Sequence, residues 1–362
     1  MTMKLLFKSL IILLLLPAVV TANDKFKGKY TKTKTLNKEY SVNANAGLRV
    51  DNSYGNVDIT TWSENRTVIE VTITTNGNDE EKVQKRLEEI DVEFSGSASL
   101  VAAKTKFGGK KDGWSIWGNK KSNVQVKVNY IIKMPVTNSV DLSNDYGSIN
   151  LNRLEGNARI SCDYGQLVIG ELSGNDNSLN FDYTNNSTIE YMKSGRINAD
   201  YSGFTLDKAE RLELNADYTN SEVQEVDELN YNADYGKLVV GKVNKLTGKG
   251  NYIPNQIGTV SSYLNLNTDY GSIHVDRLTS SVKEVVINSD YTGVKLGYDS
   301  GLSFDFVVKL SYAGFNGTND LNVQRSDNNN SNKFYEGFHG RANSGNSINI
   351  NSTYGGVTLK KL

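Results

Sequence analysis

Apolar and polar residues alternate along most of this 362-residue chain, and a tyrosine interrupts the alternation at nearly regular intervals. In "ARISCDYGQLVIGEL" an apolar residue stands four positions before the tyrosine, and two more stand three and five positions after it. Alternation of this kind predicts a half-buried strand on each side of a turn. Each unit of the pattern is therefore expected to contain two short strands.

The units repeat often enough to predict the architecture. The tyrosine recurs every 17 to 21 residues from Tyr146 to Tyr312; Tyr54 is an outlying copy, and the 42-residue gap to Tyr354 equals two steps. One unit cannot bury its apolar face alone, whereas stacked units can. We therefore predict an all-β fold, a parallel β-helix (β-solenoid) with one coil per unit. It is expected to be right-handed, in line with the handedness of parallel crossovers.

Two segments depart from the repeat. Within residues 66–134, "NDEEKVQKRLEEI" places Val83, Leu87 and Ile90 at helical spacing behind a polar capping residue. An excursion that covers an open coil end would prevent edge-to-edge association. We predict that residues 66–134 form an N-terminal β-rich capping insertion with one short helix. It belongs to a single domain of residues 23–362, and residues 325–345 are expected to form a surface loop insertion.

The Asp-Tyr motif is predicted to serve architecture rather than catalysis. A glycine after the tyrosine can adopt positive φ, and the aspartate can accept a hydrogen bond from an N–H two residues on. Tyrosines stacked between coils would add about 0.5–1.5 kcal/mol per pair beyond their buried area. Asparagines three positions earlier can form an amide ladder. The predicted structural ladder consists of Tyr146, Tyr164, Tyr183, Tyr201, Tyr218, Tyr235, Tyr270 and Tyr291.

An aspartate precedes the tyrosine in six consecutive units: Asp145, Asp163, Asp182, Asp200, Asp217 and Asp234. Carboxylates ~4.8 Å apart repel by about 0.9 kcal/mol in bulk water and by about 3.5 kcal/mol at an effective dielectric near 20. A solvated face screened by salt tolerates that repulsion, and the alternation places these side chains outward. We therefore predict no cofactor. The alternative is a column of calcium ions, which prefer oxygen ligands.

The stretch "KFGGKKDGWSIWGNKK" contains the most unusual surface chemistry in the chain. Aromatic residues among cations can stack on sugar rings or lie at an anionic membrane surface. The candidate binding residues are Trp114, Trp117, Lys110, Lys111, Lys120 and Lys121. The alternative is that both tryptophans fold back and plug the coil end.

The sequence contains little that indicates catalysis or nucleic-acid binding. His274 and His339 have no recognisable partners, and there is no GxSxG, metal-ligand spacing or phosphate loop. The net charge of −1 argues against a nucleic-acid partner. We predict that the protein is not an enzyme. A β-helical polysaccharide lyase or hydrolase is the alternative, and it rests on fold analogy alone.

The first 22 residues resemble a secretory signal peptide. Lys4 and Lys8 precede a short apolar run, and small residues end at Ala22. The apolar run is shorter than the roughly 20 residues that span a bilayer, so no transmembrane segment is expected in the mature chain. The single Cys162 precludes an intramolecular disulfide. We expect export to the periplasm or surface of a Gram-negative bacterium.

Two stretches, "LRVDNSYGNVDITTW" and "VNYIIKMPVTNSVDLSNDYGSINLNRLEGNARISCDYGQLVIGEL", resemble the "putative adhesin" domain family of bacterial envelope proteins. The resemblance covers roughly residues 45–360. It implies a β-solenoid, export and no catalytic residues. The predicted function is that of an adhesin or a binding or scaffold protein of the envelope, with a glycan or surface protein as partner. A passive envelope-homeostasis scaffold without a tight ligand is the other possibility, and the sequence leaves the oligomeric state open.

Overall fold

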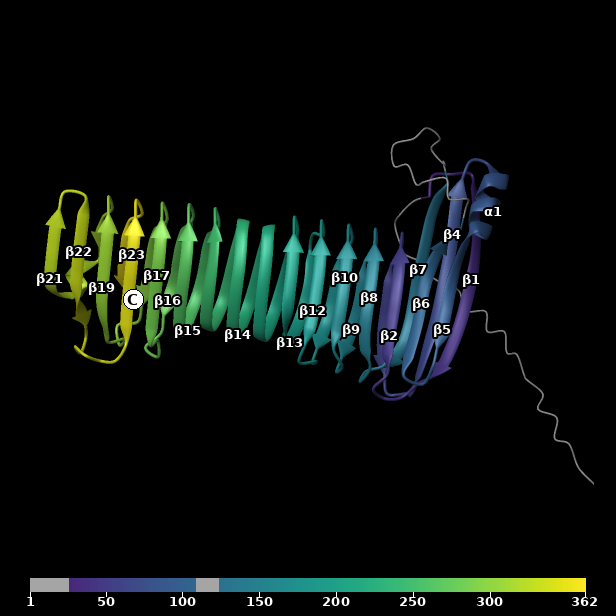
Figure 1. Cartoon of the computed structure of the whole chain (residues 1–362), viewed down its shortest axis with the longest axis horizontal. Helices are drawn as coiled ribbons and strands as arrows, with labels where there is room; N and C mark the ends of the chain where they lie inside the picture. The colour runs from purple at the N-terminus through teal and green to yellow at the C-terminus, as the bar shows by residue number, and fades with distance from the viewer. Residues whose placement is uncertain (1–25, 109–123) are drawn as a thin grey trace, which may run out of the picture.

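The computed structural model describes residues 26–108 and 124–362, which form an elongated body built almost entirely of β-strands (Figure 1). The predicted all-β class is confirmed. The segment 1–22, interpreted as a signal peptide, lies outside the described residues. In the described ranges no helix has the length and apolar character needed to cross a membrane.

Strands that lead up to the tyrosine pair in parallel and form a first row. Ile160 pairs with Leu142 on one side and with Leu179 on the other, so equivalent positions of successive units are in register. In spatial order the row contains β2 (Gly47–Ser53), β8 (Ser139–Asp145), β10 (Ala158–Asp163), β12 (Asn177–Asp182), parts of β13 (Ser187–Asp200), β14 (Gly203–Asn251) and β15 (Pro254–Asp269), then β17 (Glu284–Asp290), β23 (Ser347–Thr353) and β19 (Phe304–Ser311).

Strands that follow the tyrosine form a second row in the same way. Its members are β7 (Gln125–Pro135), β3 (Val57–Trp62), β9 (Ile149–Leu154), β11 (Leu167–Leu172), the remaining parts of β13, β14 and β15, then β16 (Ser272–Leu278), β18 (Gly293–Tyr298), β24 (Val357–Lys361) and β20 (Phe315–Asn316). We call the two rows together the parallel stack.

Single strands pass from one row to the other. In β13, residues 188–192 pair with β11, whereas residues 195–200 pair with β12. Likewise β15 pairs with β16 through residues 254–260 and with β17 through residues 263–269. The corner from the second row to the first is therefore made within one strand. The other corner lies at the tyrosine, and β14 continues across Tyr218 and Tyr235 although both have positive φ.

The alternating apolar side chains form one continuous core. Leu214 and Leu266, each four positions before a tyrosine, are at most 1% exposed. Tyr231 replaces an aliphatic residue inside the core, and its hydroxyl donates to Asn255 Oδ1 at 2.6 Å. A Cβ on Gly248, in the next unit, would collide with the Tyr231 ring. The large ring is therefore accommodated by a missing side chain one unit away.

The described parts of the capping segment, residues 66–108 and 124–134, lie at one end of the stack (Figure 1). β4 (Arg66–Gly77) pairs antiparallel with β7 and with β1 (Tyr30–Ser41), while β5 (Ile90–Gly96) pairs antiparallel with β6 (Leu100–Phe107), the neighbour of β2. The predicted helix is present as α1 (Glu80–Glu89), where Asp79 caps the Lys82 N–H and Val83 and Leu87 are buried. It contacts β1, β4 and β5.

At the other end the chain turns back into the stack. β23 lies between β17 and β19, and β24 pairs with both β18 and β20. The loop predicted for residues 325–345 is wrong for most of its length. β21 (Asn322–Asn329) and β22 (Asn332–His339) form an antiparallel hairpin beyond β19, preceded by the 3₁₀ helix η1 (Thr318–Asp320). The asparagine-rich composition obscured the alternation that buries Gly337 and His339.

Candidate functional site

Twelve tyrosines within the described ranges form one continuous column on the outside of the stack. Successive ring centroids lie 4.7–5.2 Å apart, with the ring planes 1–10° from parallel. All but Tyr54 remain 42–63% exposed. In spatial order the tyrosine column contains Tyr54, Tyr146, Tyr164, Tyr183, Tyr201, Tyr218, Tyr235, Tyr252, Tyr270, Tyr291, Tyr354 and Tyr312. It includes the eight tyrosines of the predicted ladder.

The turn is made by the tyrosine itself, which corrects the role assigned to the following glycine. Every tyrosine of the column has a φ between 50° and 65°, whereas Gly147 and Gly165 do not have positive φ. The left-handed conformation costs a residue with a Cβ about 1–2 kcal/mol. A stacked pair of rings contributes about 0.5–1.5 kcal/mol of stabilisation beyond the contribution of its buried area. Where a glycine follows, it fits a tight space, because a Cβ on Gly165 would collide with the backbone oxygen of Gly147.

The aspartates also bond differently from the prediction. Their side chains accept from the backbone N–H of the equivalent residue in the next unit, not from an N–H two residues on. Asp217 N donates to Asp200 Oδ1 at 3.2 Å, and Asp234 N donates to Asp217 Oδ1 at 3.0 Å. These carboxylates are half-exposed or exposed. In the part of the chain that the structure describes, no three His, Cys, Asp or Glu side chains converge to hold a metal ion.

The column presents ring edges and hydroxyl groups to solvent, because each inner ring has a tyrosine on both faces. The pKa values of Tyr164, Tyr218 and Tyr270 are raised, first by desolvation and then by the neighbouring phenols and aspartates. These three phenols are therefore neutral near pH 7 and can both donate and accept hydrogen bonds. Stacking of a flat ligand on the inner rings is blocked, whereas hydrogen bonding to their hydroxyls is open.

A cleft of about 1170 Å³ lies where the column meets the cap. Its aromatic wall is formed by Tyr54, Tyr146, Tyr164 and Tyr183. Its polar lining is formed by Lys27, Asn56, Gln125, Lys127, Ser148, Gln166 and Asn185. Sequence reasoning missed this cleft because its residues come from positions 26–27, β7 and four separate turns. The polar residue two positions after the tyrosine was the available signal.

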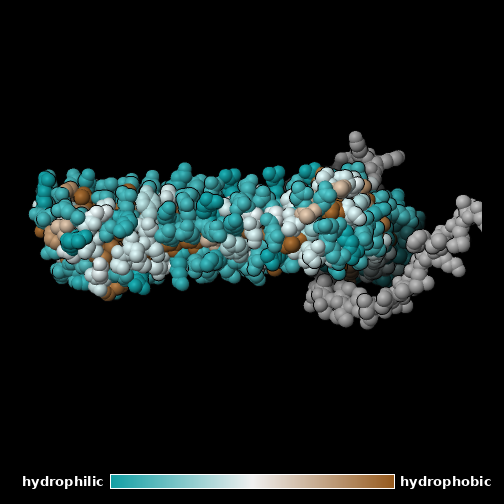
Figure 2. All heavy atoms as spheres, turned by 90° about the horizontal axis from the view of Figure 1, so that it is seen from below, coloured by the Kyte–Doolittle hydropathy of each residue, from teal (hydrophilic) through white to brown (hydrophobic). Residues whose placement is uncertain are grey.

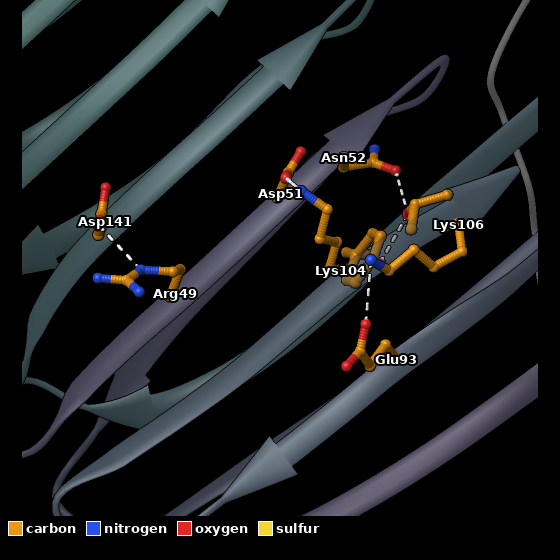
Figure 3. A network of polar contacts seen from close by, with 9 residues as sticks. Arg49, Asp51, Asn52, Glu93, Lys104, Lys106 and Asp141 are labelled. Carbon is orange, nitrogen blue, oxygen red and sulfur yellow. Dashed lines mark hydrogen bonds and ion pairs between the residues drawn. The ribbon is translucent and has the colours of Figure 1, made fainter.

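The cap is joined to the stack beside β2 by a dense polar network (Figure 3). Ion pairs connect Arg49 with Asp141 at 3.0 Å, Lys106 with Glu93 at 3.1 Å, and Lys104 with Asp51. This network crosses β8, β2, β6 and β5 in sequence.

Asn52 forms the buried part of the same junction. It donates to Asn144 Oδ1 at 2.9 Å and to Val128 O at 3.0 Å, and it accepts from Thr105 Oγ1 at 2.8 Å. Thr105 in turn contacts the Tyr130 hydroxyl at 2.8 Å. A fully satisfied buried network of this kind holds its elements in one arrangement. The cap wall next to the cleft is therefore fixed relative to the column.

The asparagines that stand three positions before the column tyrosines form short ladders of side-chain hydrogen bonds on the first row. Asn215 Nδ2 donates to Asn198 Oδ1 at 2.8 Å, and Asn198 Nδ2 donates to Asn180 Oδ1 at 2.6 Å. A smaller groove of about 630 Å³ lies over asparagines of this face. These are Asn215, Asn230, Asn232, Asn265, Asn267 and Asn288. Elsewhere, hydrophilic residues cover most of the long side seen in Figure 2.

The remaining sequence candidates that fall within the described ranges do not line the cleft or the groove. Trp114, Trp117 and the four lysines around them lie outside the described residues. His274 is exposed, with Nε2 3.0 Å from Asp276 Oδ1. His339 is buried, with Nδ1 2.6 Å from Leu302 O. Cys162 is buried, and burial raises the pKa of its thiol to about 12, so it is not a reactive thiolate near pH 7.

Comparisons with known proteins find solved structures that share little sequence identity with this chain. No family model and no curated protein matches the chain. A "putative adhesin" from Parabacteroides merdae is 9% identical, with 90% of this chain and 96% of that chain covered and a TM-score of 0.34. A "putative adhesin" from Parabacteroides distasonis is also 9% identical, with 93% and 98% covered and a TM-score of 0.33. A "putative lipid binding protein" from the same species is 9% identical, with 91% and 96% covered and a TM-score of 0.30. Likenesses at TM-scores this low carry no argument about fold or function.

Proposed function

We propose that this chain is an exported, non-enzymatic β-solenoid of the bacterial envelope, an adhesin-type binding protein that holds a glycan in the cleft. The observation that carries the proposal is the cleft itself, where four tyrosine edges and four side-chain amides line one hollow. Convergent polar groups in a concave site are typical of ligand binding.

Strand pairing supports the solenoid. Two rows in parallel register, with β13 and β15 passing from one to the other, are expected when the chain winds around one axis. The parallel crossovers favour a right-handed winding. Export is supported by the first 22 residues, whose composition is that of a signal peptide.

The lining favours a ligand rich in hydroxyl and amide groups. Asn56, Gln125, Gln166 and Asn185 each carry donors and an acceptor, and Ser148 adds a hydroxyl. Sugars offer matching groups at high density. Because the ring faces are occupied by stacking, recognition would use hydrogen bonds to phenol hydroxyls rather than ring-on-sugar contact. Lys27 and Lys127 would accommodate an acidic substituent.

The absence of turnover is part of the proposal. The carboxylates nearest the column recur in unit after unit, so no pair of them is distinguished as acid and base. The protein would retain a glycan without cleaving it. Reducing-end and unsaturated-product assays on bound polysaccharides should therefore stay at background, and measurable product would favour a lyase or hydrolase instead.

Binding is tested with a matched pair of double variants. The purified protein is screened on a glycan array, and the best ligand is measured by isothermal titration. Tyr146→Phe/Tyr164→Phe removes two hydroxyls from the cleft and keeps both rings stacked. The loss of two hydrogen bonds should weaken binding about tenfold or more. Tyr270→Phe/Tyr291→Phe, in the same column but outside the cleft, should bind like the unaltered protein.

Two results would count against this function. Silence across bacterial surface polysaccharides would favour a passive scaffold without a tight ligand. Equal weakening by both double variants would move the binding site from the cleft to the column as a whole.

A further inference from the structure

The first row ends in a strand whose outer edge is open. In the described part of the chain, β21 pairs with β22 and with no other strand. All eight residues of β21 are exposed. An edge of this kind presents unpaired N–H and C=O groups that can template pairing with another strand.

The charges on this edge are self-complementary. β21 reads NVQRSDNN, with Arg325 and Asp327 on either side of Ser326. Neither charge belongs to an ion pair among the described residues; the Arg325 guanidinium lies 5.2 Å from the centre of the Phe334 ring. Two antiparallel copies related by a twofold axis at Ser326 would place each Arg325 opposite Asp327 of the other copy. Opposite charges facing each other across strands stabilise such pairing.

We propose that two copies of this protein associate through β21, edge to edge and antiparallel, with the twofold axis at Ser326. The interface is isologous, since each copy supplies the same arginine and the same aspartate. A bulge at Gln324 interrupts the pairing of β21 with β22 and increases the local twist. The ladder between copies is therefore short and centred on the charged pair, so the dimer is expected to be weak.

Edge strands are often protected by charge, but the pattern here differs from simple protection. A row of lysines repels every copy of itself, whereas an arginine and an aspartate two residues apart attract a second copy in one register. The dimer would join two stacks at their C-terminal ends. The two caps and clefts would then lie at opposite ends of a longer rod, so one particle could engage two sites on a surface.

Sedimentation equilibrium of the purified protein, from about 1 to 100 µM, tests the proposal over the range where weak dimers form. The unaltered protein should show a monomer–dimer equilibrium. Arg325→Asp and Asp327→Arg each place like charges opposite each other and should weaken self-association at least tenfold. An equimolar mixture of these two variants restores both attractive pairs and should dimerise as heterodimers. Arg211→Asp, an exposed charge reversal in the middle of the stack, should not change the equilibrium.

The mixture guards against misfolding, because two variants that fail to fold would not rescue each other. Dimerisation of the unaltered protein, loss in each single variant and recovery in the mixture support pairing through β21. A monomer throughout the concentration range, or a dimer that neither charge reversal affects, would overturn it.

Discussion

The two ends of the parallel stack are built differently. At the cap end, antiparallel β4 and β1 continue one row, β5 continues the other, and α1 contacts β1, β4 and β5. At the C-terminal end the chain reverses in a hairpin, and aromatic side chains fill the core. There Tyr298 lies 5.2 Å from Phe304 and 5.0 Å from His339, measured between ring centroids.

Because of this difference, each end has a surface feature that the repeated units do not have: a hollow at the cap end and an open strand edge at the C-terminal end. The cap rises beside the tyrosine column and leaves a hollow, whereas the hairpin extends the row and leaves an open edge. The proposed glycan site therefore lies at one end, and the proposed self-association at the other. Units in the middle of the stack resemble one another and provide matched controls for both.

The largest effect is expected from Phe304→Ala at the C-terminal end. The ring is 1% exposed and packs against Tyr298 and His339. Its loss should cost about 3–5 kcal/mol of unfolding free energy. Each unit of a stack contacts only its neighbours, so hydrogen exchange should accelerate in β19 and β22 but not in β4 and β7. Equal acceleration at both ends would show that the ends are not independent.

At the cap end, Asn52→Ala should cost about 2–3 kcal/mol, because the buried groups of Asn144, Val128 and Thr105 lose a partner. Chemical denaturation measures this change, and hydrogen exchange should accelerate in β2 and β6. Asn215→Ala removes one link of an exposed amide ladder and serves as the control, with a change within about 0.5 kcal/mol. Similar costs for both variants would contradict a special role for the junction.

Between the ends, Tyr218 can be replaced by alanine or glycine to test the turn. Both variants lose stacking on Tyr201 and Tyr235, but alanine retains the cost of a φ of 53°. The free energy of unfolding of the glycine variant should therefore be about 1 kcal/mol larger than that of the alanine variant. An alanine variant as stable as the glycine variant would show that the positive φ at this position does not strain the backbone.

The smallest effect concerns Asp145, where the column approaches the cap. Burial first, and then the charges of Asp163 and Asp51, raise the pKa of this carboxyl above its ordinary value. Its ionisation therefore opposes folding, and the penalty is complete above the raised pKa and absent below the unfolded pKa. Asp145→Asn should raise the melting temperature slightly at pH 7, with the gain disappearing as the pH falls through the raised pKa. A lower melting temperature at pH 7 would contradict this sign.

Much of the fold could be predicted because burial follows a simple period. Alternation identified the strands, helical spacing identified α1, and the 17–21-residue step anticipated that the tyrosines would stack. The order of the last units could not be predicted in the same way. The pattern around Tyr354 fits any place in the stack equally well, so sequence could not show that β23 would lie between β17 and β19.

Other features depend on contacts between units, which no local pattern records. The left-handed φ recurs at every tyrosine of the column, before a glycine in some units and before Thr184, Ser202 or Ile253 in others, so the local sequence did not reveal it. The cleft depends on how β7 and residues 26–27 lie beside Tyr54 and Tyr146. Such packing is a property of the assembled stack.

Disulfide mapping of the C-terminal units tests the parallel stack most directly. Asn288 Oδ1 accepts from Asn351 Nδ2 at 2.8 Å, and Asn351 also pairs with Lys309 on its other side. Neighbouring strands lie about 4.8 Å apart, within reach of a disulfide, whereas strands two steps apart are not. Mild oxidation should cross-link Asn288→Cys/Asn351→Cys and leave Asn288→Cys/Lys309→Cys reduced. Cross-linking of the second pair but not the first would mean that the units follow chain order, and the proposed stack would be wrong.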